Sequence, residues 1–462
     1  MSKSIPWSYR PYRPYFVREE NEIYICRIAP APNAISFDWL GCDGETHSVF
    51  YRKRGEGDYI LADRVKGTSY TLNDLATDTD YEFYVTLGER KSTVRLAHTG
   101  EAVGTVVNYL HPEDKIYAFS GHSLCSPSLV RHPEGYLLAS MDVFEGNAPQ
   151  NLTLIFRSDD DGRTWRYVSE LMPCFWGKMF IHRGDLYMLF VSTEYGDLLI
   201  GKSTDGGYTF DAPTVLLRGS GGRGGRPGVH KNPQPVVCFN GRIWETLEWG
   251  AWGAGYHAPQ VMSCDENADL LDADNWVITP PVMYDPTWQG VAKGPSNGNI
   301  EGALAVAPDG RLYNIMRYDT AKTEPNYGLV LAYEVDTEHP EMSLRYSHAI
   351  RLEGNLSKFM IKKDEESGYY YSIISRITPD YSIHARNLLS LMRSKDLENW
   401  ELVTDLLNYR HADPAKVGFQ YVDFGIEGDD IIYLCRTAIN GAYNSHDANY
   451  STFHRIENFR DL

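Results

Sequence analysis

Apolar and polar residues alternate in short runs along this chain of 462 residues, and Gly, Asp and Asn interrupt the runs. Alternation with a period of two is typical of β-strands that bury one face. In the first hundred residues the runs cover residues 34–41, 47–55, 70–88 and 92–100. Strands at this spacing predict a small β-sandwich over residues 1–100.

A motif with the pattern S-x-D-x-G-x-T-[WF] occurs twice, at residues 158–165 and 203–210. Residues 394–400 form a degenerate third copy, and residues 263–276 look like a copy with an insertion. The Asp of such a motif can accept backbone N–H groups in a tight turn, and Gly supplies a positive φ. We therefore expect these motifs to stabilise turns and not to carry chemistry.

The remainder of the chain divides into six units, and each unit begins with an apolar strand. These first strands start near His122, Trp176, His230, Asn299, Asn355 and Gly418. Repeated units of this kind predict an all-β protein in which a six-bladed β-propeller occupies residues 105–462. The last unit has only three strand candidates, so we expect residues 105–110 to add its outer strand and close the ring.

In a propeller, the starts of the innermost strands and the ends of the second strands surround a central pocket on one face. Basic and polar candidates gather at these positions, although the formal net charge of the chain is -18. They are His122, Lys178, His230, Lys231, Arg317, Lys358, Arg376, Arg386, Gln420, Arg436 and His446. Such a concentration of cations predicts an anionic substrate. The alternative for each of them is a structural ion pair with a buried carboxylate.

The segments 299–317 and 418–424, together with the repeated Asp motif, resemble the sialidase-like propellers. In sialidases a Glu opens the inner strand of the fourth blade and an Arg closes the following strand, as Glu301 and Arg317 do here. The resemblance implies that Glu301 is the base for Tyr421, which attacks the anomeric carbon. It also implies that Arg317 binds the substrate carboxylate, and that Asp142 is the acid/base by position.

This chain departs from the sialidase pattern in the first blade. Residues 125–129 read CSPSL, where sialidases have an R-I-P motif that supplies the first of three arginines. Arg376 or Arg386 fits a second arginine, and Arg436 has no counterpart. The resemblance therefore implies an exo-acting glycosidase for an acidic sugar without specifying sialic acid. Residues 75–85 resemble the tyrosine corner of fibronectin type III domains, which implies such a fold for the sandwich.

Two other functions use the same pocket. A uronate-directed lyase would employ His230 or His446 with a Tyr to remove a proton beside a carboxylate that Arg or Lys neutralises. A non-catalytic glycan-binding propeller would need only the cations and stacking aromatic residues. Trp249 and Tyr256, which lie in a Gly-rich segment, are the candidates for stacking on a sugar ring.

The acidic composition argues against a nucleic-acid partner. No apolar run is long enough for a signal peptide or a membrane span, and seven scattered Cys include no CxxC pair. We therefore expect a cytoplasmic protein without membrane contact. No HExxH and no EF-hand pattern occurs, so no metal site or other cofactor is expected, while a structural Ca²⁺ in the ring would not be visible in the sequence. The sequence leaves the oligomeric state open.

Overall fold

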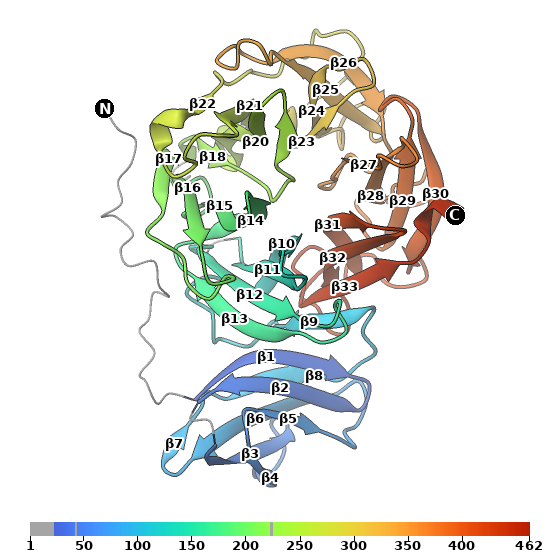
Figure 1. The fold of residues 1–462 in the computed structure, drawn as a ribbon. Helices are drawn as coiled ribbons and strands as arrows, with labels where there is room; N and C mark the ends of the chain where they lie inside the picture. Colours follow the sequence, from blue (N-terminus) through green and yellow to red (C-terminus); the bar gives the residue numbers. More distant parts are fainter. Residues whose placement is uncertain (1–22, 42–43, 147, 222–224) are drawn as a thin grey trace.

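The computed structural model describes residues 23–41, 44–146, 148–221 and 225–462, and this part of the chain is almost entirely β-structure (Figure 1). Residues 1–22 of the predicted sandwich lie outside the described residues. The helices in the described part are three single 3-10 turns: η3 (Trp252–Ala254), η4 (Ala273–Asn275) and η5 (Phe459–Asp461). No helix among the described residues is long and apolar enough to cross a membrane.

The N-terminal part is a sandwich of two antiparallel sheets. Its core forms because alternate residues of each strand point inward: Phe37 and Phe83 are fully buried, and their ring centroids lie 4.6 Å apart. One sheet has the order β1 (Tyr24–Ala31), β2 (Ala34–Leu40), β5 (Ser69–Leu72). The other joins β4 (Ile60–Lys66), β3 (Thr46–Lys53), β6 (Asp80–Leu87) and β7 (Arg90–Lys91), with β8 (Arg95–His98) also paired to β6.

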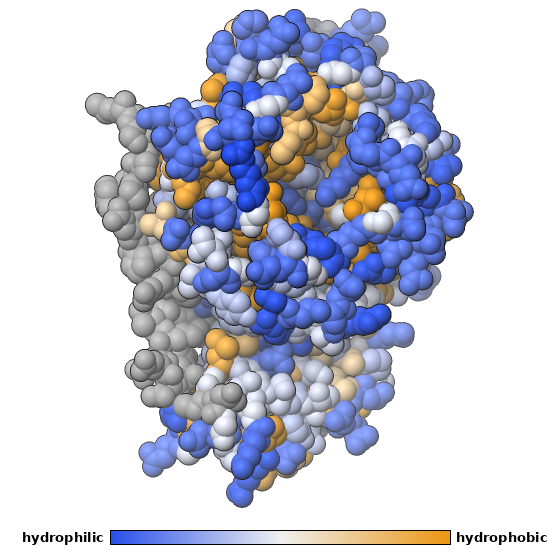
Figure 2. All heavy atoms as spheres, viewed as in Figure 1, coloured by the Kyte–Doolittle hydropathy of each residue, from blue (hydrophilic) through white to orange (hydrophobic). Residues whose placement is uncertain are grey.

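Six further sheets follow in chain order and surround a common centre, so that the chain forms a β-propeller (Figure 1). The first two are β10 (Ser123–Arg131), β11 (Leu137–Phe144), β12 (Leu152–Ser158), β13 (Arg166–Leu171), and β14 (Phe175–His182), β15 (Asp185–Val191), β16 (Leu198–Ser203), β17 (Thr214–Leu217). The third contains β18 (Gly228–His230), β19 (Val237–Phe239), β20 (Arg242–Ala251), β21 (Tyr256–Asp265) and β22 (Trp276–Ile278). Figure 2 shows that the middle of the ring is hollowed on the face in view.

The second half of the ring repeats the same antiparallel order. The fourth sheet has β23 (Asn299–Val306), β24 (Leu312–Tyr318), β25 (Leu329–Val335) and β26 (Arg345–Arg351). The fifth has β27 (Lys362–Lys363), β28 (Tyr370–Ser375), β29 (Leu388–Ser394) and β30 (Trp400–Asn408). The sixth has β31 (Gly418–Glu427), β32 (Asp430–Ala438), β33 (Tyr450–Ile456) and β9 (Thr105–Tyr109).

The strand β9 joins the two ends of the ring. It precedes the first sheet in sequence but pairs with β33, so that Tyr109 lies opposite Tyr450. The outer edge of the last sheet is thereby covered by a strand from the other end of the ring. The structure thus places residues 105–109 where the sequence predicted them.

The sandwich contacts the closing strand directly. Arg27 of β1 donates from Nε to the carbonyl oxygen of Val107 and from Nη2 to that of Val106, both at 3.0 Å. The backbone N–H of Ile28 donates to Oδ1 of Asn108 at 3.2 Å. A buried ion pair, Arg95 Nε to Asp114 Oδ2 at 2.6 Å, links β8 to the segment that follows β9. The sandwich therefore holds the strand on which ring closure depends.

The repeated Asp motifs form hydrogen-bonded turns between strands. Asp160 accepts from the backbone N–H of Thr164 at 2.8 Å and from its hydroxyl at 2.7 Å. Asp205 accepts in the same way from Thr209, at 2.9 and 2.6 Å. The indole of Trp165 packs inward and donates to the carbonyl oxygen of Gly162 at 3.1 Å. Each carboxylate thus satisfies the donors of one tight turn.

Two of the six innermost strands differ from the expected runs. In the third sheet the innermost strand is split into β18 and β19, and residues 231–236 between them are not in a strand. In the fifth sheet the apolar run that starts near Asn355 pairs only at Lys362 and Lys363. Pro233 and Pro235 explain the first break, because Pro cannot donate to a ladder. No comparable residue explains the second.

Candidate active site

Four innermost strands carry a bulge at the same relative position, and the bulged residue has a positive φ. The residues are Ser126 (φ 48), Trp176 (φ 50), Glu301 (φ 58) and Tyr421 (φ 56). The strand register shifts at each of these points. A bulge redirects a side chain, and a non-Gly residue with positive φ costs roughly 1–3 kcal/mol. Glu301 and Tyr421, which the sequence proposed as site residues, are therefore held in an unfavourable backbone conformation.

Glu301 and Tyr421 form a hydrogen-bonded pair across the ring centre. The hydroxyl of Tyr421 donates to Oε1 of Glu301 at 2.7 Å. Nη1 of Arg317 donates to the other carboxylate oxygen, Oε2, at 2.6 Å and to the Tyr421 hydroxyl at 3.2 Å. The three side chains come from β23, β24 and β31, so two sheets of the ring build one cluster.

The charges of the cluster keep Glu301 ionised. Burial alone would raise the pKa of Glu301, but the Arg317 guanidinium, His230 and the Tyr421 hydrogen bond outweigh it and lower the pKa below its ordinary value. Burial, with Glu301 beside it, raises the pKa of Tyr421 to about 12, and three arginines oppose that shift. The pair is thus a carboxylate and a neutral phenol, the states required of a base and a nucleophile before reaction.

Arg386 and Arg436 complete a positive environment around Tyr421. Arg386 donates from Nη1 to Oε1 of Gln420 and from Nη2 to the carbonyl oxygen of Leu356 at 3.4 Å. The guanidinium of Arg436 lies 5.1 Å from the centre of the Tyr421 ring. No ion pair among the described residues joins either arginine to an Asp or a Glu. Arg386 lines a pocket and can therefore take an anion from outside the protein, whereas Arg436 is 4% exposed and donates to the carbonyl oxygen of His446.

Gln420 positions this arginine pair. It is fully buried, and its amide nitrogen donates to the carbonyl oxygen of Ser445 at 2.7 Å while its oxygen accepts from Arg386. The backbone N–H of Phe419 donates to the carbonyl oxygen of Arg386 at 2.7 Å. The sequence proposed Gln420 as a substrate contact, but its burial and bonds make it a support for Arg386.

A second group of titratable and aromatic residues lies beside this cluster. Nδ1 of His230 is 2.6 Å from Oε2 of Glu248, and both side chains are buried. Nε2 of His257 is 3.0 Å from the hydroxyl of Tyr195, and the His230 and His257 ring centroids are 4.9 Å apart. Burial and the charges of His230 and Arg317 lower the pKa of His257 to about 2, so this imidazole is neutral.

Two adjacent pockets open on this face of the ring. The larger pocket has a volume of about 240 Å³, and its lining includes Arg317, Arg386, His257, Trp252 and Asp319. Leu356, Asn297 and His384 also line it. The smaller, of about 170 Å³, includes Ser357, Ser375, Ser445 and His446. Arg386, His384 and Leu356 line both pockets. The unpaired Arg386 therefore stands at the boundary between two spaces that a ligand can enter.

The proposed lysines are placed beneath the site and not in a pocket on this face. Lys178 pairs with Asp423, Lys231 Nζ is 3.1 Å from Oε1 of Glu245, and Lys358 Nζ donates to the carbonyl oxygen of Val422 at 3.3 Å. The three side chains are at most 4% exposed, so they are closed off from solvent. In this structure the three lysines belong to a buried polar network, and their contact with substrate stays a prediction.

Asp142 is also sealed from the pockets. Its carboxylate accepts from the backbone N–H of Trp176 at 2.7 Å and from the hydroxyl of Thr153 at 2.5 Å, and the residue is fully buried. Burial raises its pKa to about 7, against the effect of these hydrogen bonds. Asp142 lines neither pocket and holds the backbone at the bulge of Trp176, so its burial does not favour the expected acid/base role, which stays a prediction.

The remaining proposed residues lie at the rim or outside it. Arg376 bonds to Asp405 at 2.9 Å and to Ser390, so it is a structural ion pair. His122 faces Glu145 at 3.5 Å, and Nδ1 of His446 lies 2.7 Å from Asp447. Trp249 packs into a hydrophobic cluster, and Tyr256 is half-buried and lines neither pocket. Trp252 is the exposed aromatic residue of this segment, 55% exposed, and it lines the larger pocket.

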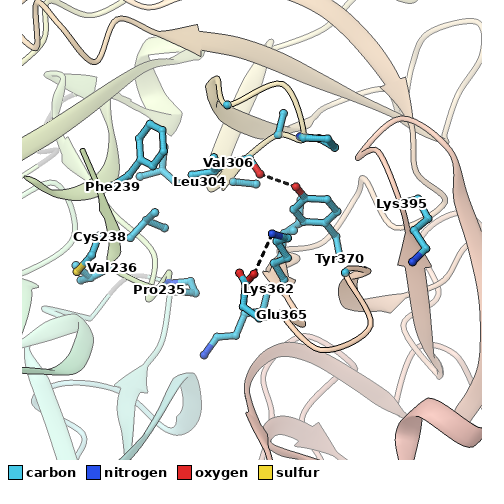
Figure 3. Close-up of a pocket in the computed structure, with 18 residues that line it drawn as sticks. Pro235, Val236, Cys238, Phe239, Leu304, Val306, Lys362, Glu365, Tyr370 and Lys395 are labelled. Atoms are coloured by element: carbon cyan, nitrogen blue, oxygen red, sulfur yellow. Dashed lines mark hydrogen bonds and ion pairs between the residues drawn. The ribbon is translucent and has the colours of Figure 1, made fainter. Parts of the chain in front are cut away.

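A further pocket, of about 820 Å³, lies at the opposite end of the innermost strands (Figure 3). Its wall is mostly apolar, with Val236, Phe239, Leu304 and Val306 from the third and fourth sheets, and Tyr370 donates to the carbonyl oxygen of Val306 at 2.7 Å. It contains none of the residues of the Tyr421 cluster.

The sequence analysis did not select His257, Tyr195, Trp252, Glu194 or Ser357 as site residues. His257 stands near the start of a third strand and Glu194 just beyond the end of a second strand, so their positions placed them at the rim of the pocket. The strand pattern alone did not distinguish them from the other rim residues. Among the described residues, no group of three or more His, Cys, Asp or Glu could hold a metal ion.

No family model matches the sequence, and no curated protein is significantly similar to it. The fold is similar to that of an α-L-arabinanase from Penicillium chrysogenum in complex with arabinobiose, with 15% identity, coverage of 79% of this chain and 100% of that chain, and a TM-score of 0.52. A leech intramolecular trans-sialidase covers 96% of this chain and 93% of its own at 9% identity and a TM-score of 0.49. An ulvan lyase covers 96% of both chains, at 9% identity and a TM-score of 0.45. At these identities the similarity concerns the fold alone.

Proposed function

We propose that this protein is a glycoside hydrolase of sialidase type, which releases an acidic sugar from the end of a glycan. The observation that carries the proposal is the Tyr421–Glu301 hydrogen bond of 2.7 Å, with Arg317 bonded to both residues. A phenol is a weak nucleophile unless a base removes its proton, and Glu301 is ionised and placed to do so. The Tyr nucleophile is a known exception to the two-carboxylate rule of glycosidases.

In this mechanism the substrate carboxylate binds Arg317 and Arg386 at the larger pocket. The hydroxyl oxygen of Tyr421 attacks the anomeric carbon while its proton passes to Glu301, and the bond to the leaving oxygen breaks. The leaving oxygen takes a proton from a general acid. In the second step that acid, now a carboxylate, takes a proton from the water that attacks the anomeric carbon, and Glu301 returns its proton to the Tyr421 oxygen as the sugar–tyrosine bond breaks. Arg436, which faces the Tyr421 ring, stabilises the negative charge that develops on the phenol oxygen.

Glu194 is the proposed source of the leaving-group proton, because Asp142 lines neither pocket. It is half-buried, follows β15, and accepts from Nε2 of Gln150 at 3.4 Å. Burial raises its pKa, with the charge of His230 opposing the shift. A carboxyl group with a raised pKa is protonated over a wider pH range, as a general acid requires.

A uronate-directed lyase is the second candidate, and the His257–Tyr195 pair favours it. Nε2 of His257 lies 3.0 Å from the Tyr195 hydroxyl, which is the imidazole–phenol pairing that an elimination uses, although the lowered pKa of His257 makes this imidazole a weak base. In that reaction a carbon-bound proton is removed, a C=C bond forms, and the glycosidic oxygen leaves without addition of water.

The two reactions differ in their products, so a panel of acidic oligosaccharides with mass and ultraviolet detection separates them. Hydrolysis adds one water to the sum of the products, whereas elimination adds none and creates an absorbing C=C bond. Glycan binding without either product would indicate a binding module. In each case we assign the sandwich a packing role, since its contacts with β9 support the ring.

A further inference from the structure

The smaller pocket has the composition of an anion site. The polar residues that line it are Ser357, Ser375, His384, Arg386, Ser445 and His446, and the apolar ones are Leu356, Ile377, Ile383 and Ala385. The lining contains no Asp or Glu. A hydroxyl-rich pocket with one guanidinium and no carboxylate suits a negatively charged oxygen group.

Ser357 provides the sharpest evidence that something polar belongs in this pocket. The residue is 2% exposed, and its hydroxyl has no hydrogen-bond partner among the described residues. A buried hydroxyl without a partner loses its hydration and receives nothing in return, so such groups are rare in native structures. A ligand oxygen in the pocket would accept the hydrogen bond that Ser357 lacks.

Arg386 supplies the charge. An arginine has five N–H donors, and the bonds described for Arg386 go to two neutral oxygens, those of Gln420 and Leu356. Burial, with the nearby charges of Arg317 and Arg436, lowers the pKa of Arg386 to about 10, against the effect of Tyr421. Arg386 is half-buried, and a cation withdrawn from water without a carboxylate partner is stabilised when an anion joins it.

The pocket is joined to the reaction site through the same arginine. Arg386 lines the larger pocket on one side and the smaller pocket on the other, and His384 and Leu356 are also shared. A planar guanidinium can bond oxygens along more than one of its edges. One ligand can therefore occupy both pockets at once, with separate anionic groups on either side of Arg386.

We propose that the smaller pocket binds an oxyanion substituent of the substrate, such as a sulfate ester or a second carboxylate, distinct from the carboxylate held by Arg317. This inference rests on the proposed function, which it deepens by defining the substrate as a glycan with two anionic groups. Ser357 and Arg386 are the residues that recognise the second group.

The test uses inorganic sulfate as the probe, with chloride at equal ionic strength as the reference, and measures binding by calorimetry. We expect sulfate to bind the full-length protein, and Ser357→Ala to weaken it by at least about fivefold, the effect of one hydrogen bond. Ser372→Ala is the matched control, because Ser372, in β28, is another buried and unpartnered hydroxyl but does not line the pocket. It should bind sulfate as the wild type does.

Sulfate binding to the Arg317→Met variant shows which of the two pockets holds the sulfate. Binding that survives this change supports the smaller pocket, and binding lost with Arg317→Met but unaffected by Ser357→Ala overturns the proposal. Absence of sulfate binding, together with equal kcat/KM for sulfated and unsulfated forms of one acidic glycan, also overturns it. If instead no glycan is cleaved while sulfate binding depends on Ser357, the proposed function fails and the anion site stands.

Discussion

Tyr421 and Glu301 lie 2.7 Å apart although 120 residues separate them in the chain, and both occupy strand bulges with φ near +57°, at 56° and 58°. The same bulge occurs at Ser126 and Trp176, so the backbone device belongs to the ring and the chemistry to the residues placed on it. A bulge at this position turns a side chain from the sheet toward the centre. In the proposed mechanism, the function of each bulge therefore depends on the residue type that stands there.

The phenol oxygen of Tyr421 should be indispensable for turnover. Tyr421→Phe removes only that oxygen, so we expect kcat to fall by roughly 10³-fold or more while substrate affinity changes little. Tyr195→Phe is the matched control, since it removes the other site phenol and should retain most activity. Steady-state kinetics and calorimetry check this, and the reverse ranking of the two variants would favour the lyase.

The acid limb of the pH–rate profile should report Glu301. Its pKa is lowered in the folded enzyme, chiefly because the charge of Arg317 outweighs burial, so the base is ionised even at moderately acidic pH. Arg317→Met removes that charge, and we expect the limb of kcat/KM to move to higher pH by about one unit or more. Arg317→Lys keeps the charge and should move it less. An acid limb that stays in place in Arg317→Met would contradict this assignment.

Asp142 should affect stability and its pH dependence more than catalysis. Its folded pKa of about 7 is above its ordinary value, so the folded state keeps a proton that the unfolded state releases, and stability falls as pH rises from about 4 to 7. Asp142→Asn should flatten the melting temperature over that range while kcat stays within about tenfold. An inactive variant with unchanged melting behaviour would support the acid/base role.

The pairing of Asp160 and Asp205 with their turns should matter for folding only. Asp160→Ala and Asp205→Ala each leave a backbone N–H and a Thr hydroxyl without a carboxylate partner, so we expect a loss of about 1–3 kcal/mol in unfolding free energy. Denaturant unfolding measures the loss, and kcat of the folded fraction should be unchanged. Inactivation without a change in stability would count against this.

The buried Arg95–Asp114 pair should couple the sandwich to the ring. Both side chains are at most 3% exposed, so Arg95→Met leaves a buried carboxylate unpaired, which typically costs about 3–5 kcal/mol. Arg54→Met breaks the exposed pair with Glu113 and should cost at most about 1 kcal/mol. Calorimetry should show Arg95→Met lowering the unfolding transition of the ring as well as that of the sandwich.

Much of the architecture could be predicted, because strand alternation, repeated turns and the missing outer strand are local patterns in the sequence. The position of β9 followed from the need to cover an edge. Glu301, Arg317 and Tyr421 were grouped by the resemblance to sialidases, in a ring where first-strand starts and second-strand ends surround one pocket. The splitting of the third innermost strand and the shortness of β27 could not be predicted from the sequence. In both places the apolar run is longer than the segment that pairs with the neighbouring strand.

The sequence could not show which polar residues face a pocket and which face the interior. Lys178 and Asp423 look like neighbours of the site by position, but the bulges turn them inward, where they pair with each other. Trp249 and Trp252 differ by three residues, and only the backbone turn at η3 exposes the second. Orientation at a bulge depends on backbone geometry that residue types do not specify.

The central claim, hydrolysis by a tyrosine nucleophile, is tested most directly by following an acidic glycan substrate in water enriched in ¹⁸O by mass spectrometry. The account predicts that the released acidic sugar gains one ¹⁸O at its anomeric carbon, and that Tyr421→Phe abolishes this product. A sugar that lacks the added oxygen and absorbs in the ultraviolet, or ¹⁸O incorporation that persists in Tyr421→Phe, would contradict it.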